Sequence, residues 1–330
     1  MDVTLDTVSE YFARLTIAEI LARLREGEIL GDWPDGWWND DRVWAAHHVL
    51  WREAITASPP VPQHFAGRGI IICGGGPKYL PGAWVTIRLL RHFGCRLPIE
   101  LWHLGRHEVD RSIEELLAPW NTTCVNAAEL RLRHPCRILR GWELKPYALL
   151  HSRFREILLL DADNCPTADP TYLFDEPAYL ATGAVFWPDY ERLGVDRALW
   201  EITEVAFRDE PECETGQILV DKRRAWPGLW LAMAFNEHSD FYYHHTMGDK
   251  DSFHLAFRRL RIEYAMPDTP VFNLGGSVMC QHDFQGRRVF QHRNLDKWRL
   301  AGDNRCIDDF WSDDLCRTFL AELRTSWKSP

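Results

Sequence analysis

The chain has 330 residues, of which 46% are hydrophobic and 26% charged, a composition typical of a globular domain with a sizeable core. Its formal net charge of −10 argues against nucleic acid or an anionic membrane as the main partner. The first residues, MDVTLDTVSEYF, lack the features of a signal peptide, and no apolar run reaches the roughly 18–20 residues that span a bilayer. The nine scattered cysteines contain no C-x-x-C pair and are typical of reduced thiols. We therefore expect a cytoplasmic protein without a transmembrane segment.

The first part of the chain differs in pattern from the rest and predicts a helical extension. Residues 16–26 have apolar side chains at helical spacing, with a threonine at the start that can cap the helix. Residues 41–57 predict a second helix, and the proline-rich segment 58–62 ends it. We therefore predict an N-terminal extension over residues 1–66, packed on a main domain over residues 67–330.

From residue 68 the chain alternates short aliphatic strands with helical segments. Strands are predicted at residues 69–73, 97–104, 123–126, 156–160, 183–187, 216–220 and 289–291. Helices are predicted at residues 81–93, 110–117, 142–152, 223–235 and 250–260, with a sharp glycine-rich loop at 74–77. This alternation predicts an α/β domain with a mostly parallel sheet covered on both faces by helices.

The most informative segment is residues 156–164, EILLLDADN, in which an aliphatic run ends at Asp161 and Asp163. The run predicts a buried strand, and open α/β sheets bind ligands beyond the carboxyl ends of their strands. Carboxylate oxygens at that position suit Mn²⁺ or Mg²⁺ held together with a diphosphate. Capping of the next segment is the structural alternative. We predict that Asp163 binds the metal directly and that Asp161 contacts it, a metal-bound water or a ribose.

Residues on neighbouring segments are candidates for binding a nucleotide. Gly74 and Gly75 would let the backbone approach such a ligand closely, and Lys78 and Tyr79 could contact its base or ribose. Lys145, one helix before the D-x-D strand, could neutralise a phosphate or bind a sugar hydroxyl. The structural alternatives are a plain turn for the glycines and a solvent-facing side chain for the lysine.

Three acidic residues are candidates for catalysis. Glu214 opens a predicted apolar strand, and it could act as a nucleophile or stabilise an oxocarbenium-like transition state. Asp249 and Asp251 precede a predicted helix, and either could bind an acceptor hydroxyl or act as its base. The alternatives are a loop acid for Glu214 and helix capping for the two aspartates.

Histidines offer a further ligand for the metal. His292 follows the last predicted strand and could supply a third ligand, while Lys297 could hold a leaving diphosphate. His282 is a competing ligand. We expect the pair His244 and His245 to have a structural role or to face an acceptor.

The chain contains sixteen tryptophans, and three of them flank the predicted site, namely Trp142, Trp187 and Trp298. Aromatic faces can stack on sugar rings. Most tryptophans nevertheless stabilise a protein through buried area, so we expect most of these to pack in the core.

Over residues 68–300 the order of these motifs resembles the fungal-type α-mannosyltransferases of glycosyltransferase family 71. The longest matching string is GWELKPYALLHSRFREILLLDADNCPTADPTYLF, and ETGQILVDK, GDKDSF and FQHRNLDKW follow it in order. The resemblance implies a Rossmann-like GT-A fold, Mn²⁺ bound at the D-x-D motif, a nucleotide-sugar donor and retention of anomeric configuration. It adds Gln217 to the candidate donor-binding residues and favours roles for Lys145, Asp161, Asp163, Glu214, Asp249, Asp251, His292 and Lys297.

We therefore predict a metal-dependent retaining glycosyltransferase that moves a hexose from GDP-mannose or a UDP-hexose to a hydroxyl of a glycan, protein or small-molecule acceptor. One alternative is a nucleotidyltransferase that makes a nucleotide sugar, although Pro77 removes an amide from the loop that would bind a triphosphate. The other is a non-catalytic carbohydrate-binding protein.

The extension over residues 1–66 would shape the acceptor site or a homo-oligomer contact.

Overall fold

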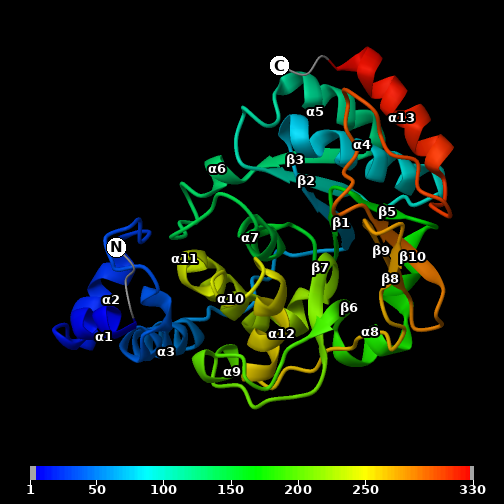
Figure 1. Ribbon diagram of the computed structural model, residues 1–330. Coiled ribbons are helices and arrows are strands. Elements are labelled where there is room, and N and C mark those ends of the chain that lie inside the picture. Colours follow the sequence, from blue (N-terminus) through cyan, green and yellow to red (C-terminus); the bar gives the residue numbers. More distant parts are fainter. Residues whose placement is uncertain (1–4, 328–330) are drawn as a thin grey trace.

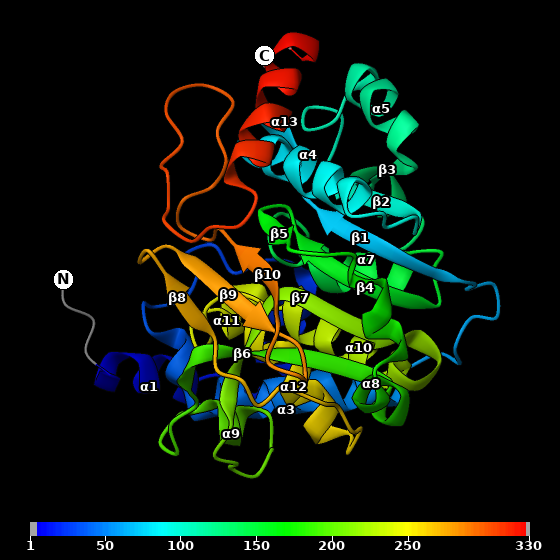
Figure 2. The ribbon, with the colours of Figure 1, turned by 90° about the vertical axis from the view of Figure 1, so that its right-hand side faces the viewer.

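The computed structural model describes residues 5–327, which fold around two β-sheets flanked by helices (Figures 1 and 2). The strands of the larger sheet are β1 (Arg68–Cys73), β2 (Ile99–His103), β3 (Thr122–Asn126), β4 (Glu156–Asp161), β6 (Ala184–Arg192) and β7 (Pro211–Asp221). They lie in the order β3-β2-β1-β4-β7-β6, with parallel pairing from β3 to β4 and antiparallel pairing of β7 with β4 and β6. The predicted α/β fold with a mostly parallel mixed sheet is confirmed.

Alternate side chains of the central strands enter two hydrophobic cores, one on each face of the sheet. Ile71 and Leu159 belong to one core, whereas Ile72 and Leu160 belong to the other. The first face is covered by α7 (Leu144–His151), α10 (Lys222–Glu237) and α12 (Lys250–Arg259), and the second by α4 (Gly76–His92) and α5 (Arg111–Leu117). The aliphatic run of β4 is continuous because both of its faces are buried.

Two elements begin earlier than predicted. Helix α4 begins at Gly76 rather than at residue 81, because Pro77 lies in its first turn, where a missing N–H costs no helical hydrogen bond. Strand β7 begins at Pro211 rather than at residue 216. Glu214 therefore lies inside a buried strand and does not open it, which corrects the prediction.

A second, smaller sheet follows the D-x-D motif, and the sequence pattern predicts only its strand at residues 289–291. It contains β5 (Asn164–Pro166), β8 (Phe272–Leu274), β9 (Val278–His282) and β10 (Arg288–His292), in the antiparallel order β5-β10-β9-β8. Such short strands with mixed side chains give a weak periodic signal. The pairing of β5 with β10 sets Asn164 opposite His292, directly after Asp163.

Short helices complete the main domain. They are α6 (Ala127–Leu130), α8 (Pro177–Thr182), α9 (Leu199–Ile202) and α11 (Ser239–Tyr242). Near the end of the chain, α13 (Asp313–Ser326) lies beside α4 (Figure 1), where the indole N–H of Trp84 donates to the carbonyl of Phe319 at 2.7 Å. Within the described residues, no helix has the length and apolar character required to cross a membrane.

The extension forms α1 (Leu5–Ala13), α2 (Ile17–Glu26) and α3 (Asp41–Thr56), which confirms the helices expected at residues 16–26 and 41–57. Thr16 and Glu19 form a reciprocal capping box at the start of α2. These helices share one hydrophobic core with α10 and α11 of the main domain.

A buried ion pair within the main domain also binds the backbone of the extension. The guanidinium of Arg137 lies 2.6 Å from a carboxylate oxygen of Asp240, and both side chains are almost fully buried. The same carboxylate accepts the backbone N–H of Ile29 at 2.8 Å, and Arg137 also donates to the carbonyl of Gly27. The pair thus joins the segment after α2 to α11.

Removal of one partner of this pair is expected to destabilise the whole fold. Asp240→Ala leaves the charge of Arg137 buried and unpaired, so the free energy of unfolding in urea should fall by about 3–5 kcal/mol. The control is Asp209→Ala, which breaks the exposed pair with Arg192 and should cost less than about 1 kcal/mol. Equal losses in the two variants would contradict a special role for the buried pair.

Candidate active site

A cavity of about 500 Å³ opens at the carboxyl ends of β1 and β4, where open α/β sheets bind ligands. Eight residues that the sequence predicts for the site line this cavity: Gly74, Gly75, Lys78, Tyr79, Lys145, Asp161, Asp163 and Lys297. Leu104, Glu108, Arg140, Trp142 and Asn294 also line it. The fold therefore brings residues from five separate segments of the chain to one cavity.

The glycine-rich loop is packed too tightly against its neighbours to carry side chains. A Cβ atom at Gly74 would lie 2.9 Å from the Cβ atom of Ala162, the residue between the two aspartates, and one at Gly75 would lie 2.9 Å from Glu108. Glycine at these positions lets the end of β1 approach the D-x-D motif. The loop therefore forms one wall of the cavity.

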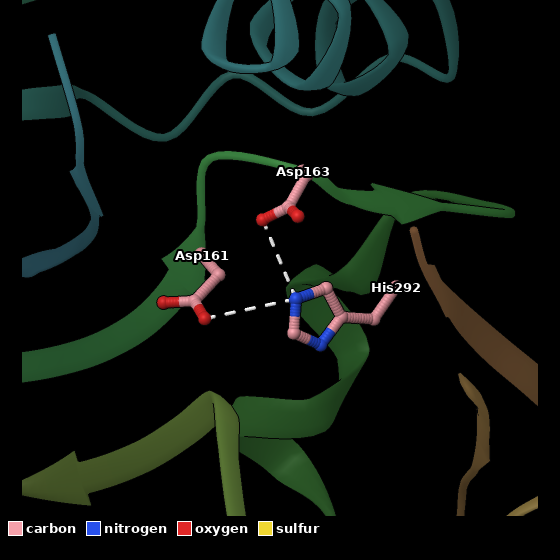
Figure 3. Close-up of side chains that lie close together, drawn as sticks. All are labelled: Asp161, Asp163 and His292. Atoms are coloured by element: carbon pink, nitrogen blue, oxygen red, sulfur yellow. Dashed lines mark ion pairs between the residues drawn. The ribbon is translucent and has the colours of Figure 1, made fainter. Parts of the chain in front are cut away.

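Asp161, Asp163 and His292, which we call the triad, converge on one point (Figure 3). Asp161 ends β4, and the antiparallel pairing of β5 with β10 brings His292 beside them. The Nε2 atom of His292 lies 3.3 Å from a carboxylate oxygen of Asp163 and 3.7 Å from one of Asp161. One ligand atom from each residue lies within 4.8 Å of the others. Two carboxylates and an imidazole fit Mn²⁺ well and Mg²⁺ less well, because Mg²⁺ prefers oxygen.

The charges of the three side chains are strongly coupled. Burial alone would lower the pKa of His292, but the carboxylates of Asp163 and Glu214 outweigh burial and raise it to about 10. Burial alone would raise the pKa of Asp163, but His292 and the contacting ammonium of Lys297 lower it instead. The proton on His292 and the ammonium of Lys297 therefore compensate the charge of the carboxylates. A divalent cation can replace both.

Lys145 is buried against the acidic residues and does not face solvent. Its Nζ atom lies 3.0 Å from Asp161 and 3.6 Å from Asp249, and it donates to the hydroxyl and carbonyl of Thr215 at 3.2 Å. Although burial opposes its charge, these acids and Glu214 raise the pKa of Lys145. Lys145 therefore presents a permanent positive charge to the cavity.

Asp249 lies behind Lys145, with its carboxylate 3.6 Å from the ammonium, and does not line the cavity. Burial raises its pKa to about 6 in spite of the neighbouring lysine. A carboxylate in this position holds the ammonium of Lys145 in place. The structure thus favours a positioning role over the predicted direct contact with an acceptor.

Glu214 and Gln217 lie on β7 beneath the triad and do not line the cavity. Gln217 is fully buried, its amide N–H donates to Glu214 at 2.7 Å, and its amide oxygen accepts from Asn164 at 2.7 Å. Both ends of the Gln217 side chain are engaged inside the protein, so the structure does not favour the predicted contact with a donor.

Asp251 lies outside the site. Its carboxylate accepts the backbone N–H of Cys213 at 3.1 Å and lies 3.4 Å from the imidazole of His254. Asp251 is fully buried and does not line the cavity, so the structure does not favour the predicted catalytic role. It supports the contact of α12 with β7.

The other histidines also lie away from the triad. His282 borders a different cavity beside Arg287 and Trp311, so it does not compete with His292 as a ligand. His244 stacks on Trp38 with ring centroids 3.5 Å apart, and the imidazole of His245 lies 3.0 Å from the carbonyl of Trp38. Both residues bind the N-terminal extension and have structural roles.

Trp142 differs from the other two tryptophans that flank the motif. Trp187 and Trp298 are buried, as expected of core residues, whereas Trp142 is 55% exposed and lines the cavity. Its ring packs edge-on against Tyr243 and lies over Gly248, where a Cβ atom would approach the indole to 2.8 Å. The indole is thus held in place while much of its surface stays open to the cavity.

Sequence reasoning missed three residues that support the site. Asn164 follows the D-x-D motif directly, which is the one signal that could have marked it. Thr215 and Gly216 are neighbours of Glu214, but no pattern distinguishes them. Their contacts depend on strands that are distant in the sequence.

The pH dependence of stability tests the structural role of Asp251. Burial raises its pKa to about 7, so the folded chain holds a proton that the unfolded chain has already released. The associated stability is complete below the pKa of the unfolded carboxyl group and is lost as the pH rises through about 7. Asp251→Asn removes this loss, so the stability of the variant relative to the wild type should rise by on the order of 1–4 kcal/mol between pH 4 and pH 8.5.

Urea unfolding at the two pH values measures this difference. Asp303→Asn, at an exposed position, should change stability equally at both. A constant difference between Asp251→Asn and the wild type across this range would contradict the protonated buried carboxyl group.

Comparison with known proteins places the chain in a family. Residues 67–213 and 207–292 match the mannosyltransferase family Mannosyl_trans3. Alpha-1,2-mannosyltransferase MNN2 of Saccharomyces cerevisiae is 26% identical over 277 residues, which cover 67% of this chain and 46% of MNN2. For alpha-1,2-mannosyltransferase MNN24 of Candida albicans, the values are 27% over 255 residues, 65% and 36%. The chain thus spans less than half the length of these relatives.

A solved structure shares the fold. Galactosyltransferase LgtC, in complex with donor and acceptor sugar analogs, aligns with a TM-score of 0.50 at 13% identity, and the alignment covers 78% of this chain and all of LgtC. The likeness confirms the GT-A fold. With the family match extending over most of the chain, the protein belongs to the Mannosyl_trans3 family of mannosyltransferases.

Proposed function

We propose that the protein is a Mn²⁺-dependent retaining glycosyltransferase that transfers mannose from GDP-mannose to a hydroxyl of a carbohydrate acceptor. The observation that carries the proposal is the convergence of Asp161, Asp163 and His292 at a cavity beyond the end of β4. The mannosyltransferase names of MNN2 and MNN24 support mannose as the hexose. Retention is an expectation from the family resemblance, and the anomer of the product, read by proton NMR, tests it.

The three triad residues would hold the metal. A bound divalent cation neutralises the charge that develops on a leaving diphosphate. Lys297 contacts Asp163 from the rim of the cavity, and its side chain is 30% exposed. When a divalent cation compensates the charge of Asp163, the ammonium of Lys297 is free to bind a phosphate oxygen. Lys78 lines the same cavity and supplies a second positive charge.

Lys145 is suited to bind the donor sugar or its phosphate. It lines the cavity with a buried ammonium whose orientation is fixed by Asp161, Asp249 and Thr215. A fixed donor in a poorly hydrated site stabilises developing negative charge without reorganising when the bond breaks. Lys145 therefore combines binding with electrostatic stabilisation.

We also propose the cytoplasm as the compartment of this protein. All nine cysteines are free, which supports a reducing environment.

Loss of one triad ligand should abolish metal-dependent nucleotide binding. In calorimetric titrations with GDP in the presence of Mn²⁺, we expect Asp163→Asn to lower the affinity at least tenfold, because a direct carboxylate ligand is lost. Asp308→Asn, on the exposed surface, is the matched control and should bind like the wild type. Unchanged Mn²⁺-dependent binding by Asp163→Asn would refute the metal assignment. Pyrophosphate release from GTP and mannose 1-phosphate would instead indicate a nucleotidyltransferase.

The open face of Trp142 is the proposed platform for the acceptor sugar. With methyl α-D-mannopyranoside as acceptor, Trp142→Ala should raise the acceptor KM about fivefold, since one stacking contact contributes on the order of 1 kcal/mol. The affinity for GDP with Mn²⁺ should not change. Trp311→Ala, which removes a similarly exposed indole beside the other cavity, is the control. A loss of GDP affinity in Trp142→Ala would assign the indole to the nucleotide base and contradict the acceptor role.

A further inference from the structure

We propose that Glu214 is a positioning residue that fixes the imidazole of His292 as a metal ligand, and that it is not a nucleophile. The inference rests on the proposed function and assigns a role to a residue that lies beneath the site. It is carried by the contacts of the Glu214 carboxylate and by the glycine that allows them.

The carboxylate of Glu214 is surrounded by donors on three sides. One oxygen, Oε1, accepts the backbone N–H of Gly216 at 2.8 Å and lies 3.3 Å from Nδ1 of His292. The other oxygen, Oε2, accepts the amide N–H of Gln217 at 2.7 Å.

Gly216 is the feature that lets His292 and Glu214 meet. A Cβ atom at this position would lie 2.5 Å from Nδ1 of His292 and 2.8 Å from both carboxylate oxygens of Glu214. Any side chain would therefore enter the space between the imidazole and the carboxylate. Glycine at position 216 of β7 thus allows His292 of β10 to approach Glu214 this closely.

The contact selects the orientation in which the histidine can bind a metal. Nδ1 of His292 is buried, and among the described residues it has no hydrogen-bond acceptor in good alignment, although Oε1 of Glu214 lies 3.3 Å away. A proton on Nδ1 would face this oxygen. The lone pair of Nε2 then points toward Asp161 and Asp163, which lie on the other side of the ring. A carboxylate that accepts from the far nitrogen of a ligating histidine fixes its tautomer and increases its basicity.

The same contacts argue against nucleophilic attack by Glu214. A nucleophilic carboxylate must present a free oxygen to the anomeric carbon. Both oxygens of Glu214 are engaged, its side chain is buried, and it does not line the cavity. His292 lies between Glu214 and the two aspartates.

The test measures Mn²⁺ binding and turnover separately. Binding of Mn²⁺ alone is followed by electron paramagnetic resonance of the free ion, and turnover is measured with GDP-mannose as a function of Mn²⁺ concentration. Glu214→Gln should weaken Mn²⁺ binding about 10- to 100-fold and raise the Mn²⁺ concentration for half-maximal rate in parallel. Saturating Mn²⁺ should recover most of the turnover. Glu212→Gln changes a buried glutamate on the same strand that contacts Lys250 and should bind Mn²⁺ like the wild type.

A second variant separates the position of the carboxylate from its presence. Gly216→Ala keeps Glu214 but places a methyl group between it and His292, so it should reproduce the loss of Mn²⁺ affinity. An effect of Glu214→Gln on turnover at saturating Mn²⁺, with unchanged metal affinity, would overturn the positioning role. So would mass spectrometric detection of a mannosylated Glu214 in the wild-type protein. If the wild type itself binds no Mn²⁺, the proposed function fails and the inference fails with it.

Discussion

The burial of acidic side chains at the end of β4 is the constraint on which the rest of the site depends. A carboxylate removed from water costs several kcal/mol unless a cation or hydrogen-bond donors compensate it. Four carboxylates gather here, and the two lysines among their partners supply only half of the opposite charge. A divalent cation bound to a neutral imidazole would balance the remainder, which is a physical reason to expect a metal. The carboxylates are those of Asp161, Asp163, Glu214 and Asp249, and the lysines are Lys145 and Lys297.

The compensating groups come from segments that the topology brings together. The turn after Asp163 leads directly into β5, and the pairing of β5 with β10 places His292 beside the motif. The segment after β10 then brings Lys297 into contact with the carboxylate of Asp163. On the opposite side, α7 carries Lys145 into the wall between β4 and β7. The smaller sheet therefore supports the residues that could hold a metal.

Distance from the cavity separates the acidic residues by role. Asp161 and Asp163 line the cavity and can touch a ligand. Glu214 and Asp249 lie one contact behind it, where they hold His292 and Lys145. Asp251 is buried elsewhere, between α12 and β7. The residue type is the same in each case, and the partners decide the function.

The sequence by itself determined the sheet of the main domain, the helices of the extension and the position of the D-x-D motif. These features follow from local periodicity and from the continuous aliphatic run that a doubly buried strand requires. The sequence also predicted His292 as a third metal ligand and Lys297 as a group that could hold a diphosphate, both from their place after a predicted strand. The tertiary structure alone decided that Gln217 and Asp251 face the interior, that Glu214 lies beneath His292, and that Trp142 is open to the cavity. These outcomes depend on strand register and on close approach at Gly216, which are contacts between distant segments that leave no periodic trace in the chain.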